Sequence, residues 1–143
     1  MISSASHAYP LDVHRLYLVG FSNGGMMAYD YACSHPASVA AIGVVSSAYM
    51  SNCTPARAVP VMAVHGGADG VLPYRGGWSS FLNRNVPSLA QSQAHFRTLD
   101  ARAGTPERNV FLPGADHVWP RLGWQGNFDT TGQLLAYLWA HHR

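Results

Sequence analysis

A serine in a tight, glycine-flanked turn is the residue of this sequence best suited to act as a nucleophile. Residues 16–19 are apolar and strand-like, residues 20–24 read Gly-Phe-Ser-Asn-Gly, and residues 26–33 have helical character. A Gly-x-Ser-x-Gly pentapeptide between a strand and a helix is typical of a nucleophile elbow, which exposes the serine at its apex. We expect Gly20 and Gly24 to be required because side chains there would collide with the adjoining strand and helix. In an elbow, Ser22 can attack a carbonyl, and the N-terminus of the following helix places a positive potential beneath it. The alternative interpretation is an ordinary glycine-rich turn.

The base that would activate Ser22 must be a histidine. The chain has nine arginines and no lysine, which excludes a Schiff-base lysine, a P-loop lysine and a Ser–Lys pair. In an open α/β sheet, functional groups gather beyond the carboxyl ends of the strands. His117 lies in a loop directly after a strand-like run, so we expect it to be the base. His65 closes another such run, where we expect a packed, hydrogen-bonded side chain rather than a base.

The same rule selects the acid that would orient His117. Asp69 follows a strand-like run at the functional edge, whereas Asp116 is poorly placed to accept a hydrogen bond from the imidazole next to it in sequence. The order Ser22, Asp69, His117 is the Ser…Asp…His order of α/β-hydrolases. In such a triad the serine attacks an acyl carbonyl, the histidine transfers its proton, and the aspartate fixes the imidazole tautomer. The backbone N–H of Asn23, directly after the nucleophile, is the expected oxyanion donor.

The elements that must position these residues alternate along the chain. Strand-like runs alternating with helical candidates favour one α/β domain with a parallel sheet and right-handed crossovers. The runs are almost continuously apolar, as in strands covered on both faces. We expect Asp129 to cap the last helix and the segments 71–77 and 114–126 to be long loops. The expected strands are 15–19, 39–46, 60–65 and 109–112, and the expected helices are 25–33, 88–103 and 130–141.

Composition narrows the function further. With 143 residues, 48% of them hydrophobic, the chain can build one core. Its net charge of +2 and its scattered arginines give no support to nucleic-acid binding. No apolar stretch reaches membrane-spanning length, and the first ten residues lack a signal-peptide pattern. The histidine and cysteine spacings fit no metal site.

The two cysteines, Cys33 and Cys53, flank an apolar strand-like run. One interpretation is a disulfide, which would close a loop of about twenty residues and contribute about 3 kcal/mol in the chain-entropy model. That bridge would indicate an extracytoplasmic location. The other interpretation is two separately buried thiols.

Several motifs in order resemble the polyhydroxybutyrate depolymerase and feruloyl esterase branch of the α/β-hydrolases. They are the lead-in at residues 11–17, GFSNGGMM at 20–27, Cys-Thr-Pro at 53–55, HGGAD at 65–69 and HVWP at 117–120. The resemblance covers nearly the whole chain. It implies a serine esterase that uses no metal or organic cofactor, cleaves small-molecule or polymeric esters, and is extracellular or secreted.

One departure from that family is the absence of its N-terminal portion. The sequence begins in what resembles the tail of the helix before the elbow strand, so we expect a truncated α/β-hydrolase of about four mainly parallel strands with flanking helices. The strand at residues 15–19 would then be an edge, which favours a homodimer. The loop that donates the second oxyanion N–H would also be missing, and such a loss typically costs about 10²–10³ in rate.

Three aromatic residues near the expected site are candidate substrate contacts. Trp119, Trp78 and Tyr74 could line an acyl or aromatic-group pocket, or could equally be packing residues. An open, shallow site favours short-chain or accessible esters over a substrate held in a deep pocket, and the family resemblance implies polyester or feruloyl-type esters. Two alternative functions stay open: a serine peptidase of the prolyl-oligopeptidase type, and a catalytically inactive fragment or binding module.

Overall fold

The centre of the molecule is a four-stranded parallel sheet. The computed structural model describes residues 2–97 and 107–142. The strands lie in the order β1-β2-β3-β6, all parallel, so the predicted sheet is confirmed. Each strand differs from its predicted bounds by no more than a few residues. The four are β1 (Tyr17–Phe21), β2 (Ala41–Val45), β3 (Val61–Gly66) and β6 (Arg108–Leu112).

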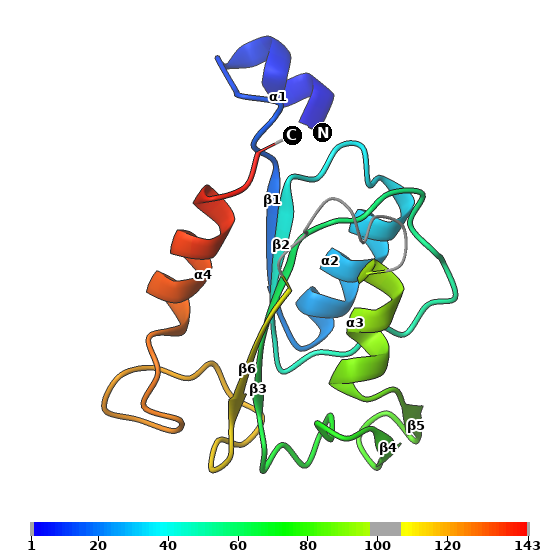
Figure 1. The fold of residues 1–143 in the computed structure, drawn as a ribbon, viewed down its shortest axis with the longest axis vertical. Helices are drawn as coiled ribbons and strands as arrows, with labels where there is room; N and C mark the ends of the chain where they lie inside the picture. Colours follow the sequence, from blue (N-terminus) through cyan, green and yellow to red (C-terminus); the bar gives the residue numbers. More distant parts are fainter. Residues whose placement is uncertain (1, 98–106, 143) are drawn as a thin grey trace.

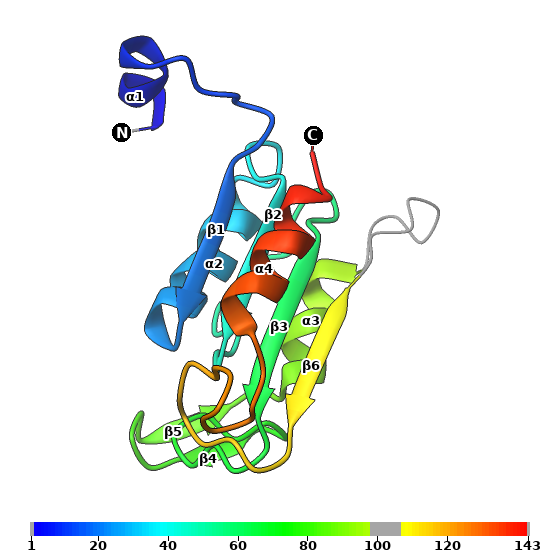
Figure 2. The same cartoon turned by 90° about the vertical axis from the view of Figure 1, so that its left-hand side faces the viewer.

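Helices cover both faces of this sheet (Figures 1 and 2). α2 (Asn23–Ser34) and α3 (Leu89–Arg97) pack on one face, and α4 (Thr130–Trp139) packs on the other. Every residue of β2 and β3 is buried, which explains their uninterrupted apolar sequences. Of the helix predicted over residues 88–103, the portion from residue 98 lies outside the described residues.

The remaining elements are small. α1 (Ile2–Ala8) stands apart from the body beyond the amino ends of the strands (Figure 2). A hairpin of β4 (Gly77–Ser79) and β5 (Arg84–Val86) follows the loop after β3, and the sequence analysis did not predict it. The carboxylate of Asp129 accepts the Gly132 N–H at 2.9 Å, which confirms the predicted cap of α4. None of the helices within the described ranges has the length and apolar character needed to span a bilayer.

β1 is one edge of the described sheet, as predicted. Its five residues include no charge and no proline, the devices with which proteins usually protect such edges. Val19 is 50% exposed and Phe21 is 36% exposed. The homodimer expected at this edge stays a prediction.

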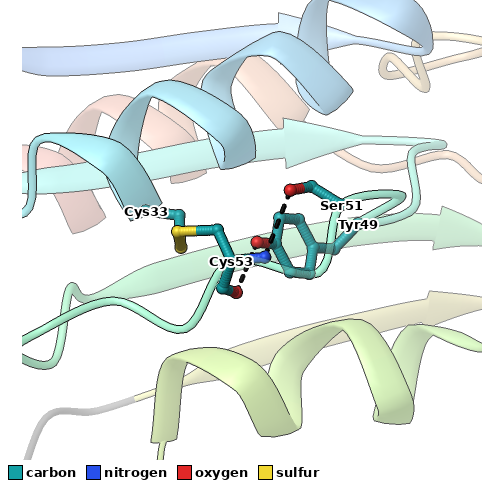
Figure 3. The surroundings of a disulfide bond; sticks show 4 residues. All are labelled: Cys33, Tyr49, Ser51 and Cys53. Atoms are coloured by element: carbon teal, nitrogen blue, oxygen red, sulfur yellow. Dashed lines mark hydrogen bonds between the residues drawn. A yellow bond between two sulfur atoms is a disulfide. The ribbon is translucent and has the colours of Figure 1, made fainter.

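A disulfide joins the end of α2 to the segment after β2. Cys33 and Cys53 are bonded, with 6.1 Å between their Cα atoms. Figure 3 shows Cys33 on the last turns of α2 and Cys53 beside Tyr49, whose hydroxyl donates to the Cys53 carbonyl. The bridge therefore ties one helix to the loop that precedes β3.

Candidate active site

Ser22 occupies a strained turn between β1 and α2. Its φ of 52° and ψ of −118° are unusual for a residue with a side chain, and such a conformation costs about 1–3 kcal/mol. Two hydrogen bonds hold it there: the Ser22 N–H donates to the Val45 carbonyl at 2.9 Å, and the Ser47 hydroxyl donates to the Ser22 carbonyl at 2.9 Å. The neighbouring strand thus fixes the turn that exposes the serine.

The glycines of the elbow serve different purposes. A Cβ on Gly20 would lie 2.1 Å from the carbonyl carbon of Gly24, so only glycine fits there. A Cβ on Gly25 would lie 2.6 Å from the Ser47 side chain. A Cβ on Gly24 would meet nothing within 4 Å, so the prediction that Gly24 is needed to avoid a collision was wrong. The close approach is made by the backbone of residue 24 toward Gly20, while the Gly24 Cβ position itself faces open space.

The structure brings the three predicted triad residues together beyond the carboxyl ends of β1, β3 and β6. His117 Nε2 lies 2.9 Å from Ser22 Oγ. His117 Nδ1 lies 2.9 Å from Oδ2 and 3.1 Å from Oδ1 of Asp69. Because a carboxylate only accepts, Nδ1 carries the proton and Nε2 presents its lone pair to the serine hydroxyl. This is the geometry in which an imidazole can take a hydroxyl proton.

Asp69 is buried, and its carboxylate is well supplied with donors. Oδ1 accepts the backbone N–H groups of Val71 at 3.0 Å and Leu72 at 2.7 Å. Burial raises the pKa of Asp69, but hydrogen bonds from His65, Leu72 and His117, together with the charge of His117, outweigh it and lower the pKa to about 2. The carboxylate is therefore ionised at neutral pH, as an imidazole-orienting group must be.

Asp116, the alternative acid, shapes the loop that carries His117. Its Oδ1 accepts the backbone N–H of His117 at 2.7 Å, and its own N–H donates to Gln125 Oε1 at 2.9 Å. The loop also lies against β3, because a Cβ on Gly66 would be 2.2 Å from the Ala115 carbonyl oxygen. Asp116 thus orients the backbone of residue 117, while Asp69 contacts its imidazole.

Two residues of the site were missed by the sequence analysis. The Phe21 ring packs on the His117 imidazole, with 4.9 Å between their centroids. Ser47, the second residue after β2, donates its hydroxyl to the Ser22 carbonyl and so supports the elbow. Their sequence signals were an aromatic residue at the variable position before Ser22, and a serine at the carboxyl end of a buried strand.

The three aromatic residues predicted to line a substrate pocket lie in different surroundings. Tyr74 packs against the core cluster on the α2 face, with its ring 4.5 Å from that of Phe111. Trp119 packs against the cluster on the α4 face and donates to Thr131 Oγ1 at 3.2 Å. Trp78 is exposed on β4. Tyr74 and Trp119 therefore make packing contacts, whereas Trp78 is 59% exposed, and substrate binding by the three stays a prediction.

The backbone around Ser22 offers donors for a negative charge. Asn23 is the first residue of α2, and the N–H groups of a helix's first turn have no acceptor within the helix. The Asn23 N–H is therefore available beside the nucleophile, where the helix dipole adds a positive potential. Within residues 2–97 and 107–142, no cluster of three His, Cys, Asp or Glu side chains is arranged to hold a metal ion.

Comparison with known proteins yields one family and several named relatives. The family model described as phospholipase/carboxylesterase matches residues 3–94, which include Ser22 and Asp69. Feruloyl esterase D of Neurospora crassa is 36% identical over 73 residues, covering 50% of this chain and 25% of that enzyme. A bifunctional acetylxylan esterase/xylanase of Neocallimastix patriciarum is 36% identical over 115 residues, covering 80% of this chain and 17% of that one. The chain thus matches a quarter or less of these relatives' length.

Solved structures show the same fold at low sequence identity. A thermostable esterase superposes with a TM-score of 0.64 and 17% identity, covering 99% of this chain and 35% of that one. SOBER1 of Arabidopsis thaliana superposes with a TM-score of 0.60 and 16% identity, covering 97% of this chain and 59% of that one. The fold of this chain is therefore that of part of an α/β-hydrolase domain.

Proposed function

Because this chain belongs to the phospholipase/carboxylesterase family of α/β-hydrolases, we propose that it hydrolyses carboxylic esters with Ser22 as nucleophile. The observation that carries the proposal is one continuous hydrogen-bonded path. Ser22 Oγ is 2.9 Å from His117 Nε2, and His117 Nδ1 is 2.9 Å from Asp69 Oδ2. Such a path lets the hydroxyl lose its proton as it attacks.

The proposed reaction proceeds through an acyl-enzyme. Ser22 Oγ bonds to the ester carbonyl carbon while its proton passes to His117 Nε2, and the carbonyl oxygen becomes an oxyanion facing the Asn23 N–H. The bond to the alcohol oxygen then breaks, and that oxygen takes the proton from His117. Water attacks the acyl-enzyme in the same way, which releases the carboxylic acid and returns a proton to Ser22. Asp69 stays ionised throughout and steadies the imidazolium.

The substrate we propose is a short-chain, polyester or feruloyl-type ester. Two features favour an accessible ester over one held in a deep cavity. His117 lies close to the surface, with 15% of its side chain exposed, and Phe21 and Trp78 are exposed aromatic rings. Relatives named as feruloyl and acetylxylan esterases support the same class.

The activity is tested by hydrolysis of p-nitrophenyl esters of increasing acyl length, with methyl ferulate alongside. Ser22→Ala should abolish turnover, because it removes the hydroxyl that His117 activates. Ser34→Ala, an exposed serine at the opposite end of α2, is the matched control and should retain wild-type rates. Equal turnover by Ser22→Ala, or no turnover by the wild type, contradicts the proposal. Faster cleavage of aminoacyl p-nitroanilides than of any ester would favour the peptidase alternative.

We also propose an extracellular or secreted location. The Cys33–Cys53 disulfide supports it, because such bridges persist in oxidising compartments. Thiol labelling of protein taken directly from its native source checks this point. Two alkylated cysteines without prior reduction would indicate a reducing compartment instead.

A further inference from the structure

A second imidazole, that of His65, contacts the carboxylate that orients His117. His65 is the next-to-last residue of β3 and is 2% exposed. Its Nε2 lies 2.7 Å from the Leu72 carbonyl oxygen and 3.4 Å from Oδ2 of Asp69. The Tyr74 ring packs edge-on against it, with 5.8 Å between centroids. His65 Nε2 therefore faces both the Asp69 carboxylate and the carbonyl of Leu72, which lies later in the loop that carries Asp69.

The contacts of His65 determine which ring nitrogen holds the proton of the neutral imidazole. A backbone carbonyl can only accept, so the 2.7 Å contact to Leu72 requires a proton on Nε2. Nδ1 is buried and has no hydrogen-bond partner in the described part of the chain. A proton there would be a buried unsatisfied donor, which costs about 1–3 kcal/mol. The Nε2–H is thus a donor shared between Leu72 and Asp69.

The two oxygens of Asp69 are held by different groups. Oδ1 is fixed by the backbone N–H groups of Val71 and Leu72. Oδ2 is the oxygen 2.9 Å from His117 Nδ1, and His65 is the side chain that approaches it from the β3 side. The backbone N–H groups on Oδ1 and the His65 imidazole on Oδ2 together determine the rotation of the Asp69 carboxylate, and hence its hydrogen bond with His117.

We propose that His65 is a positioning residue, whose shared Nε2–H closes the loop between Gly66 and Leu72 and fixes Asp69 Oδ2 opposite His117. This inference rests on the proposed function only for its kinetic consequence. His65 touches neither Ser22 nor, on this account, the substrate; it acts through Asp69. A misplacement of about 1 Å in a catalytic array can cost about 10²-fold in rate, so a group that holds the acid is expected to affect kcat rather than KM.

The test compares two substitutions at position 65 that differ in hydrogen bonding. His65→Leu fills a similar volume but has no donor, and we expect kcat for p-nitrophenyl acetate to fall by about 10- to 100-fold with little change in KM. His65→Gln keeps an N–H donor of comparable reach and should restore most of that loss. The same pair at exposed His95 on α3 should leave kcat unchanged. Rates are expressed per folded molecule, from urea titrations of each variant.

A spectroscopic measurement separates this proposal from catalysis. The proton between His117 Nδ1 and Asp69 should give a far-downfield proton resonance in the wild type, assigned by its loss in Asp69→Asn. We expect this resonance to persist in His65→Gln and to shift or vanish in His65→Leu. If the wild type shows the resonance but no esterase activity, the proposed function fails while the positioning role is still decided by the spectra.

Two results would overturn the proposal. One is a His65→Leu protein with wild-type kcat and an unchanged downfield resonance. The other is equal losses in Leu and Gln, which would indicate packing rather than hydrogen bonding. If His65→Leu does not fold, His65→Asn replaces it in the test. The asparagine side chain is polar but too short to reach Asp69. We expect the same loss of kcat as for His65→Leu.

Discussion

The two ends of α2 differ in backbone strain and in how they are held in place. The first turn follows Ser22, whose backbone is strained and whose side chain is partly exposed. The last turn carries Cys33, which is buried in the core and bonded to Cys53. One end holds a reactive group in an unfavourable conformation, and the other is fixed covalently and by apolar packing.

The strained turn at Ser22 must be held by its surroundings, because no covalent bridge fixes that end of α2. Strain of about 1–3 kcal/mol persists only when surrounding contacts determine the backbone more strongly than its own preferences. Here those contacts are the pairing of Ser22 with Val45, the Ser47 hydroxyl, and the close approach of Gly20 to the first turn of α2. We expect perturbations at the elbow to affect stability and activity together, and perturbations at the disulfide to affect stability alone.

The largest effect is expected from Gly20→Ala. The added Cβ would meet the backbone of residues 24 and 25 at 2.1–2.4 Å, where no flexible side chain can move away. We expect a loss of more than about 4 kcal/mol in the free energy of unfolding, measured by urea titration, and loss of activity. Gly24→Ala is the matched control: it meets nothing within 4 Å and should be neutral or stabilise α2 by about 0.5–1 kcal/mol. Similar losses in the two variants would contradict the described elbow.

Removing the disulfide should have the next largest effect. Replacing Cys33 and Cys53 together by alanine should lower the free energy of unfolding by about 3 kcal/mol, because the bridge closes a loop of 20 residues. The esterase rate per folded molecule should stay at the wild-type value. A marked fall in that rate would show that the two ends of α2 are coupled.

The smallest of these effects is a pH dependence carried by Asp69. Its pKa is about 2 in the folded protein and about 3.9 in an unfolded chain. A lowered pKa stabilises the fold above pH about 4, and this stabilisation is lost as the pH falls through about 2. Between pH 7 and pH 2, wild type should therefore lose about 2 kcal/mol of stability that Asp69→Asn does not lose. Urea titrations at the two pH values measure this, and the disulfide-free variant should keep the wild-type dependence.

Much of the site could be predicted because its chemistry is tied to strand ends. Ser22, Asp69 and His117 each come directly after or shortly after a strand, and parallel strands bring their carboxyl ends to one edge. The absence of lysine reduced the candidate bases to histidines. The almost continuously apolar strand-like runs then predicted a sheet covered on both faces.

The features that were missed depend on tertiary contacts. The pentapeptide contains two flanking glycines, but only the folded turn shows that the Cβ position of Gly20 points inward and that of Gly24 outward. The contact of Phe21 with His117 joins residues 96 apart in sequence. The β4–β5 hairpin has strands of three residues, too short to show an alternating pattern.

Covalent labelling with a fluorophosphonate probe tests the central claim most directly, since it reports on an activated serine without assuming a substrate. We predict that the purified protein is modified rapidly at Ser22, located by mass spectrometry of the digested chain, and that His117→Gln is modified far more slowly. A wild type that stays unlabelled, or labelling of Ser22 at the same rate without the imidazole, would contradict the account.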